Sequence, residues 1–242
     1  MRLDKFFTSQ SLATRKEAKE LVKKGRVSVN GETVKFSDIQ IDPERDIILL
    51  DGQNVSYKEY IYIMLNKPQG VVSATEDTAH RTVLDLVPPE LYRKGLFPAG
   101  RLDKDTEGFV LLTDDGDFAH RMLAPKKHVP KTYHAVIDQP IDETDIAAFR
   151  EGLRLSDGTV CMRAELKILQ AESNPLVEVI LQEGKYHQVK RMFESRGKRV
   201  VYLKRVKIGG LPLDETLELG ECREILHKEL EKILDTQKGQ NF

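Results

Sequence analysis

The first 25 residues carry short apolar stripes at helical spacing between charged positions. Apolar side chains recur every three to four residues in "LDKFF" (residues 3–7) and again in "EAKELV" (residues 17–22), so two short helices are predicted. Thr14 and Glu17 have the spacing of a capping box, which satisfies amide groups at the start of the second helix. Gly25 stands where a left-handed C-terminal cap would end that helix.

A strand pattern replaces the helical pattern after the second predicted helix. Residues 27–29 alternate as in a half-buried strand, and Asn30-Gly31 follows, a dipeptide typical of a tight hairpin turn. A further strand is predicted for residues 47–50, and residues 51–60 are expected to form a linker. Two helices and a hairpin make a unit too small to be an enzyme by itself.

The remaining chain mixes strand and helix patterns without the regular alternation of a parallel fold. We therefore predict an α+β fold, in which a small helix-helix-hairpin domain precedes a larger domain with a mainly antiparallel mixed sheet flanked by helices. The expected strands are 60–65, 108–113, 131–137, 176–182 and 199–207, and the expected helices are 116–123, 142–151, 187–196 and 226–234. The expected domains are 1–58, including the linker, and 59–234, followed by a disordered tail at 235–242.

Composition changes this picture little, but the distribution of charge suggests a partner. The 242 residues have a net charge of −1, yet residues 1–30 hold eight Lys and Arg against three acids, and residues 183–207 hold nine against two. Basic surfaces of this kind favour a nucleic acid, although charge runs are also common on solvated helix faces. No apolar run approaches the roughly 20 residues of a membrane span. The two cysteines give no disulfide framework, which favours a reducing, cytoplasmic compartment.

The acid-rich stretch "PAGRLDKDTEGFVLLTDDG" (residues 98–116) contains the strongest candidate for chemistry. Asp103 lies two residues after Arg101, so in an extended segment both side chains point to one face while Leu102 points into the core. The other acids are interpreted as structural: Asp105 as a turn residue, Glu107 as an exposed residue before a strand, and Asp114, Asp115 and Asp117 as turn or helix-start residues. From the residues alone, catalysis by Asp103 and a structural ion pair with Arg101 both remain open.

Two further segments carry candidate binding residues. On the helix predicted from "HQVKRMF", His187, Lys190 and Arg191 lie opposite the apolar face. In "KTYHAVI" (131–137), Tyr133 is either a core residue or, in a basic setting, a ring on which a base can stack. The six histidines show no metal-ligand spacing, and no glycine-rich phosphate loop follows a strand, so neither a metal nor a nucleotide cofactor is predicted.

The N-terminal segments "RLDKF", "TRKEA" and "GRVSVNG" resemble the S-four-like RNA-binding domain that is appended to several RNA enzymes. The resemblance covers about residues 1–50 and implies that basic side chains of this unit contact RNA phosphates. Without it, a generic protein-interaction module would fit equally well. The residues expected to contact RNA are Arg2, Lys5, Arg15, Lys16, Lys19, Lys23, Lys24 and Arg26 in this unit, with His187 and Arg191 in the larger one.

Four segments of the larger part are similar to motifs of the RsuA type of pseudouridine synthase: "LNKPQGVVSATEDTAHRTVLDLV", "PAGRLDKDTEGFVLLTDDGDFAHRMLAP", "KTYHAVI" and "EGKYHQVKRMF". The resemblance implies an enzyme that isomerises a uridine of small-subunit ribosomal RNA to pseudouridine without a metal or cofactor. It implies that Asp103 is the essential carboxylate, that Arg101 helps to displace the flipped uridine, and that Tyr133 contacts the target base. Lys190 stands where many relatives have an arginine that pairs with the aspartate, and a lysine would pair without the bidentate geometry.

Two alternatives are kept beside this reading. One is a synthase that acts on large-subunit ribosomal RNA or transfer RNA, and the other is a non-catalytic RNA-binding factor in ribosome assembly. A set that a pure binding protein would not need favours an enzyme: Arg101, Asp103, Tyr133 and Lys190. The expected partner is ribosomal RNA or an assembling small-subunit particle, with no membrane partner, and the expected state is a cytoplasmic monomer.

Overall fold

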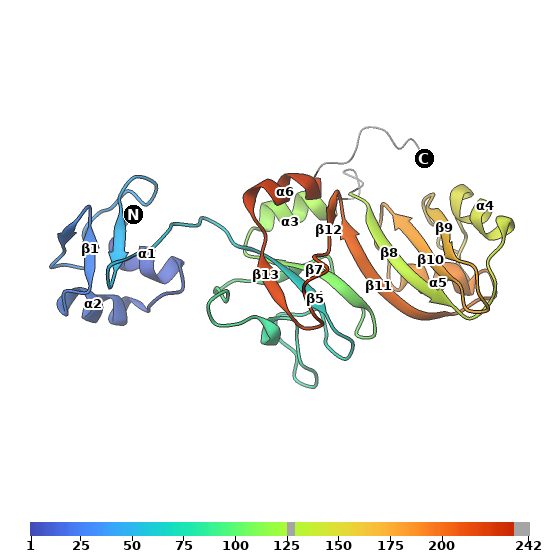
Figure 1. Ribbon diagram of the computed structural model, residues 1–242, viewed down its shortest axis with the longest axis horizontal. Helices are drawn as coiled ribbons and strands as arrows, with labels where there is room; N and C mark the ends of the chain where they lie inside the picture. Colours follow the sequence, from blue (N-terminus) through green and yellow to red (C-terminus); the bar gives the residue numbers. More distant parts are fainter. Residues whose placement is uncertain (125–128, 235–242) are drawn as a thin grey trace. The chain divides into compact units, whose positions relative to one another are not determined.

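The computed structural model describes residues 1–124 and 129–234, which form two compact units (Figure 1). Unit 1 comprises Met1–Ile61 together with Tyr92–Leu96, and unit 2 comprises Tyr62–Leu91 together with the chain from Phe97 onwards. The tail expected at 235–242 lies outside the described residues, and the expected domain limits stay predictions. Within the described ranges, no helix is long and apolar enough to cross a membrane.

Unit 1 contains two helices and a small sheet. The helices are α1 (Leu3–Ser9) and α2 (Arg15–Lys23), and the strands, in sheet order, are β2 (Glu32–Thr33), β1 (Val27–Val29), β3 (Ile48–Leu50) and β4 (Gln53–Asn54). The predicted capping box is confirmed, because the Glu17 amide donates to the Thr14 hydroxyl (3.2 Å) and the Thr14 amide donates to the Glu17 carboxylate (2.8 Å). The predicted hairpin is confirmed as well, since Asn30 and Gly31 both have positive φ (53° and 86°).

One expectation for unit 1 is wrong. Residues 51–60 are not a linker at their start, because β4 pairs with β3 across a turn in which Asp51 and Gly52 have φ of 52° and 78°. This second tight turn has the same left-handed backbone as the first. A two-residue strand is too short to show alternation, which explains why the pattern does not reveal it.

A nine-stranded sheet forms the centre of unit 2. Its main path runs β13-β5-β7-β11-β8-β10-β9, with β6 paired to β7 and β12 paired to β11. Neighbouring strands are antiparallel except β7 and β11, which are parallel. The strands are β5 (Tyr62–Lys67), β6 (Phe97–Ala99), β7 (Glu107–Thr113), β8 (Lys131–Ile137), β9 (Glu165–Gln170), β10 (Leu176–Leu181), β11 (Val200–Ile208), β12 (Leu211–Pro212) and β13 (Cys222–Glu224). The helices are α3 (Gly116–Leu123), α4 (Glu143–Glu151), α5 (Gln188–Glu194) and α6 (His227–Leu234).

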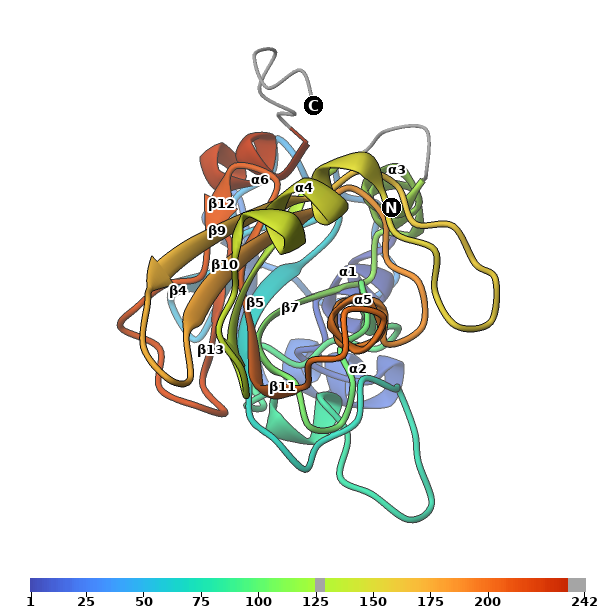
Figure 2. The ribbon, with the colours of Figure 1, turned by 90° about the vertical axis from the view of Figure 1, so that its right-hand side faces the viewer.

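The helices of unit 2 cover the sheet in two groups. At the β13–β5–β7 end, α3 and α6 lie side by side (Figure 1), and Phe118 and Leu230 join the apolar cluster that contains Phe109 of β7. At the other end, the rings of Phe149 of α4 and Phe193 of α5 pack together with centroids 4.9 Å apart and planes inclined by 46°. Figure 2 views α5 almost along its axis, beside β11. Helix α5 therefore lies over the half of the sheet that contains β8, β10 and β11.

The predicted helices and strands of unit 2 are confirmed to within two residues at each end. The pattern does not predict β6, β9, β12 and β13. Strand β9 is exposed over most of its length at the edge of the sheet, and the other three contain only two or three residues. The three short strands have too few residues to show alternation, and β9 alternates only over residues 165–168 before the apolar pair Ile168-Leu169, which is too brief a pattern for the prediction.

Gly108 allows β7 and β11 to approach at the point where they pair in parallel. Its φ is +99°, it pairs with Arg205 of β11, and a Cβ at this position would overlap the Arg205 backbone carbonyl. The Arg205 side chain of β11 reaches over β7. Its Nε donates to the Phe109 carbonyl (2.7 Å), and its terminal nitrogen donates to the Gly100 carbonyl (2.5 Å). The start of the segment after β6 is thereby tied to the sheet.

Replacing Gly108 with alanine should weaken this junction. Gly108→Ala is expected to lower the free energy of unfolding by at least about 2 kcal/mol, because the positive φ and the backbone overlap both oppose a side chain. Gly116→Ala is the matched control, since Gly116 begins α3 with open space around it, and it should change the free energy by less than about 1 kcal/mol. Urea denaturation measures both, and equal stability of the two variants would contradict this account.

Candidate active site

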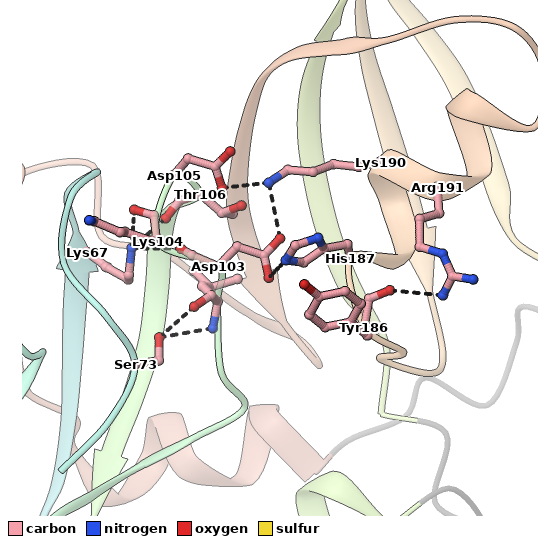
Figure 3. Close-up of polar contacts among 11 residues, drawn as sticks. Lys67, Ser73, Asp103, Lys104, Asp105, Thr106, Tyr186, His187, Lys190 and Arg191 are labelled. Atoms are coloured by element: carbon pink, nitrogen blue, oxygen red, sulfur yellow. Dashed lines mark hydrogen bonds and ion pairs between the residues drawn. The ribbon is translucent and has the colours of Figure 1, made fainter. Parts of the chain in front are cut away.

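A pocket in unit 2 lies between the segment that follows β6 and the turn that precedes α5 (Figure 3). Its walls come from four residues of that segment, from the turn together with the start of α5, and from the sheet: Arg101, Leu102, Asp103 and Thr106; Gly184, Lys185, His187, Gln188 and Val189; and Tyr133, Leu181 and Leu203. These three sheet residues lie on the neighbouring strands β8, β10 and β11. The parallel pairing of β11 with β7 brings the 101–106 segment beside them, since that segment leads directly into β7.

Ser73 fixes the backbone in the middle of the 101–103 segment. Its hydroxyl donates to the Leu102 carbonyl (2.9 Å) and accepts from the Leu102 amide (3.0 Å), and the Leu102 side chain is buried. The prediction that Leu102 points into the core is confirmed. Arg101 and Asp103 flank this fixed point and both line the pocket.

Lys67 holds the rest of this loop from inside the protein. It ends β5 and is completely buried, and its ammonium donates to the backbone carbonyls of Asp103 (3.0 Å), Lys104 (3.3 Å), Thr106 (2.9 Å) and Pro68 (3.0 Å). Burial lowers the pKa of Lys67 to about 8, against the opposing effect of nearby carboxylates. Sequence reasoning missed this residue, although a lysine at the end of the apolar run "YIYIMLNKP" is an unusual and visible signal.

Asp103 lies between the Lys190 ammonium and the His187 imidazole of the α5 segment (Figure 3). Its Oδ2 is 3.2 Å from Lys190 Nζ, and its Oδ1 is 3.4 Å from His187 Nε2. The side chain of Asp103 is 27% exposed, so its carboxylate remains open to the pocket. The prediction that His187 is the first residue of the helix is wrong. His187 precedes α5 as its N-cap, with φ of 48°.

Lys190 is shared with a second carboxylate. Asp105 is a turn residue, as predicted, and it also lies 2.6 Å through its Oδ1 from the Lys190 ammonium, closer than Asp103 does. Burial lowers the pKa of Lys190, but the hydrogen bonds to Asp105 and Asp103 outweigh burial and raise it. Burial likewise raises the pKa of Asp105, and the Lys190 contact outweighs it, so the pKa falls below its usual range. The side chain of Asp105 is 70% exposed, so this contact holds the lysine loosely.

Tyr133 is both a core residue and a pocket residue. It is 8% exposed and lies on β8 opposite Val179 of β10 and Arg205 of β11. Its ring lines the pocket together with Leu181 and Leu203. The two interpretations left open by the sequence are therefore compatible, because the ring packs on the sheet and still faces the space beside Asp103.

The remaining acids of the 98–117 stretch divide as follows. Asp115 caps α3 by accepting from the Phe118 amide (2.8 Å) and also accepts from the Tyr62 hydroxyl (2.6 Å), which confirms its structural role. Glu107 is not an exposed residue, because it begins β7 half-buried and accepts a hydrogen bond from the Tyr202 hydroxyl (2.7 Å). These hydrogen bonds engage both carboxylates, and neither residue lines the pocket.

Three of the cations predicted to contact RNA are engaged within the protein. Arg2 forms a two-point contact with Asp4 (2.7 and 3.1 Å), and Arg26 forms one with Asp51 (2.5 and 2.7 Å). Arg191 lies 2.5 Å from the Asp157 carboxylate. The others in unit 1 are exposed, and no ion pair involves them among the described residues: Lys5, Arg15, Lys16, Lys19, Lys23 and Lys24.

No group of three or more His, Cys, Asp or Glu side chains in the described parts of the chain is arranged to hold a metal ion. Cys161 is buried and Cys222 is half-buried, and neither is oxidised. The chemistry that the pocket offers is an open carboxylate beside a lysine, a histidine, a tyrosine ring and an arginine. Such a site can stabilise or attack an electron-poor carbon and can accept a proton.

The buried position of Lys67 leads to a test of how the loop is held. Lys67→Met is expected to lower the free energy of unfolding by about 2–5 kcal/mol, because it leaves buried carbonyls without their charged donor. Amide exchange at Thr106, whose N–H donates to the Asp103 carbonyl (3.1 Å), should become faster. Lys104→Met is the control, since this neighbouring lysine is exposed and its removal should change stability by about 0.5 kcal/mol or less. Unchanged amide exchange in the Lys67 variant would contradict the claim that Lys67 holds this loop.

Comparisons with known proteins place the chain in a family. The family model for RNA pseudouridylate synthases matches residues 61–195, and the model for the S4 domain matches residues 1–46. The chain is 46% identical to an uncharacterized RNA pseudouridine synthase of Bacillus subtilis (strain 168), YtzG, over 98% of this chain and 100% of that one. It is 42% identical to ribosomal small subunit pseudouridine synthase A of Haemophilus influenzae, over 97% of this chain and 100% of that one. The protein of the same name from Escherichia coli (strain K12) is 38% identical over the same shares.

A solved structure supports the same conclusion. The crystal structure of a pseudouridylate synthase matches with a TM-score of 0.67 at 41% identity and covers 96% of this chain and 99% of that chain. The likeness confirms the predicted α+β fold with its small N-terminal RNA-binding domain. By these matches over nearly its whole length, the chain belongs to the RNA pseudouridine synthase family and is an isomerase that carries an S4 domain.

Proposed function

We propose that this enzyme isomerises a uridine of small-subunit ribosomal RNA and that Asp103 is the reacting carboxylate. The observation that carries the proposal is the position of Asp103. Its carboxylate is open to a pocket, with one oxygen 3.2 Å from the Lys190 ammonium and the other 3.4 Å from the His187 imidazole, and the loop beneath it is fixed by Lys67 and Ser73. A reacting group needs this combination of a fixed backbone and an accessible side chain.

The reaction suits an unassisted carboxylate. Isomerisation breaks the bond between uracil N1 and ribose C1′, turns the uracil and joins C1′ to C5. C5 loses its proton and N1 gains one, so the step balances with no net oxidation and no group donated. An aspartate is ionised at neutral pH, so it needs no neighbouring base to activate it. Lys190 and His187 would stabilise its negative charge before it reacts and release it as the uridine approaches, since both contacts are longer than 3 Å.

Arg101 and Tyr133 would make the uridine accessible. A base inside a helix must leave its stack before C1′ can reach the carboxylate, which costs a few kcal/mol and least in loops. The Tyr133 ring forms an apolar floor for the extruded uracil, and Arg101, exposed beside Asp103, can fill the space that the base leaves. The contact of Tyr133 with the uracil and that of Arg101 with the vacated stack would both offset the free-energy cost of unstacking.

The names of the relatives support the RNA target. The proteins of Haemophilus influenzae and Escherichia coli that match over nearly the whole chain are named for the small ribosomal subunit. The exposed cations of unit 1 would bind phosphates near the target uridine, which agrees with its match to the S4 domain. We propose that the enzyme acts in the cytoplasm, where ribosomal RNA is made and assembled, and the expected monomeric state stays a prediction.

Removing the charge of Asp103 tests the chemistry. Asp103→Asn keeps the size of the side chain and is expected to reduce pseudouridine formation roughly a thousand-fold or more, a loss of about 4 kcal/mol of transition-state stabilisation. Asp117→Asn is the matched control, because this acid is exposed in the first turn of α3 and should leave the rate unchanged. RNA affinity, measured separately by filter binding, should stay within about threefold in both variants, since affinity depends mainly on phosphate contacts.

The in vivo readout identifies the target. Pseudouridine is mapped in ribosomal and transfer RNA from cells that lack the protein, with complementation by the wild type, Asp103→Asn and Asp117→Asn. One site in small-subunit ribosomal RNA should disappear and return only with the wild type and the control. A lost site in another RNA would redirect the proposal to that RNA, and restoration by Asp103→Asn would exclude Asp103 as the reacting group.

The salt dependence of binding tests unit 1. Each phosphate contact adds roughly 0.7–0.9 to the slope of log affinity against log salt concentration. Lys19 and Lys23 are exposed on α2, so the double variant Lys19→Met, Lys23→Met should reduce that slope by about 1.4–1.8. Lys228→Met, an exposed lysine of α6, is the control and should leave the slope unchanged. An unchanged slope in the double variant would mean that α2 does not face the RNA.

A further inference from the structure

Tyr186 is a large aromatic side chain left in solvent at the edge of the pocket. It is 76% exposed, more than any other large apolar or aromatic side chain among the described residues. One face of its ring stacks on the imidazole of His187, with centroids 3.8 Å apart and planes inclined by 19°. The order of groups in Figure 3 is therefore the Asp103 carboxylate, the imidazole and then the phenol ring.

The backbone around this pair is built to present it. His187 adopts a left-handed conformation (φ 48°, ψ 34°), which costs a non-glycine residue about 1 kcal/mol and tends to persist at functional sites. The Tyr186 carbonyl accepts from the Arg191 guanidinium (3.3 Å), and the turn is closed by the Lys185 amide, which donates to the Gln188 side chain (2.8 Å). The two rings are thus held in place although one of them faces water.

The stack has one covered face and one open face. His187 lies against the inner face of the Tyr186 ring and within 3.4 Å of Asp103 at its far edge, so the ring cannot turn inward to pack in the core. A flat ring that is exposed on one face and held by a stacked imidazole on the other has the properties of a platform for a nucleobase. A base stacked on an aromatic ring contributes about 1–3 kcal/mol and does so without regard to sequence.

Base flipping supplies the ligand for such a platform. When the target uridine leaves its stack, each neighbouring base loses one stacking partner. Stacking of the exposed base face on an aromatic ring would recover part of that lost free energy. We propose that the open face of Tyr186 binds a nucleobase adjacent to the flipped uridine, with His187 linking this platform to Asp103. The inference rests on the proposed function, because it assumes that a uridine is extruded beside Asp103.

The absence of tryptophan from the chain makes a direct test possible. Tyr186→Trp introduces a single fluorophore at the platform, and stacking of a base should quench its emission. The probe is an oligouridylate of about ten nucleotides, compared with an oligomer of abasic ribose phosphate of the same length and charge. Quenching by the oligouridylate alone is the expected result, and no quenching, or equal quenching by both oligomers, would overturn the proposal. Leu226→Trp, at an exposed position remote in sequence from the pocket, controls for nonspecific quenching.

Turnover separates the aromatic ring from a merely structural side chain. Tyr186→Phe keeps the ring and should retain the wild-type KM, whereas Tyr186→Leu should raise KM for the RNA by about 5- to 100-fold with little change in kcat and in Tm. The same KM in the phenylalanine and leucine variants would contradict a stacking role. If the leucine variant instead loses both kcat and thermal stability (a lower Tm), the side chain has a structural role and the proposal is overturned.

The two proposals fail in distinguishable ways. Fluorescence quenching reports binding and needs no turnover, so it can be measured in the Asp103→Asn background. Base-dependent quenching together with turnover that survives Asp103→Asn would refute the assignment of Asp103 and leave the platform intact. Turnover that requires Asp103, without base-dependent quenching, would refute the platform alone.

Discussion

The buried ammonium of Lys67 is the interaction on which the site depends. An ammonium inside a protein needs acceptors for its three N–H groups, and a loop keeps one shape only where its backbone has partners. The loop carbonyls of Asp103, Lys104 and Thr106 accept the hydrogen bonds of the Lys67 ammonium. The same bonds give the loop backbone its partners. The bonds go to the backbone, so the side chains of the loop are left to face the pocket. Asp103 is therefore held at its backbone carbonyl, while its partly exposed carboxylate reaches the pocket beside Lys190 and His187.

Local patterns predict most of the fold. Helical spacing reveals α2 and α3, and the Asn30-Gly31 pair reveals the first hairpin, because each of these features depends on residues close in sequence. The order of strands is different, since the parallel pair β7 and β11 joins residues about a hundred positions apart. The only local trace of that pairing is Gly108, whose positive φ and missing side chain allow the contact. A single glycine does not say which strand approaches it, so the topology is not readable from the pattern.

The site is predictable in part for the same reason. Tyr133 follows from strand alternation and Lys190 from helical spacing, but their meeting with Asp103 comes from the resemblance to a family and not from spacing. Lys67 escapes because its acceptors are carbonyl groups, which every residue has and no side-chain pattern records. The ion pair of Arg191 with Asp157 escapes for a related reason, because the aspartate belongs to a turn far away in sequence, and RNA contact by Arg191 stays a prediction.

The separation between Asp103 and Lys190 has a consequence for the order in which the protein is made. They lie 87 residues apart, and Arg205, which fixes Gly100, comes later still. During synthesis the N-terminal unit emerges and folds first, long before the carboxylate acquires its cation. A nascent chain can thus hold a folded N-terminal unit while the larger unit is still being translated, and the pocket is complete only when β11, which carries Leu203 and Arg205, enters the sheet.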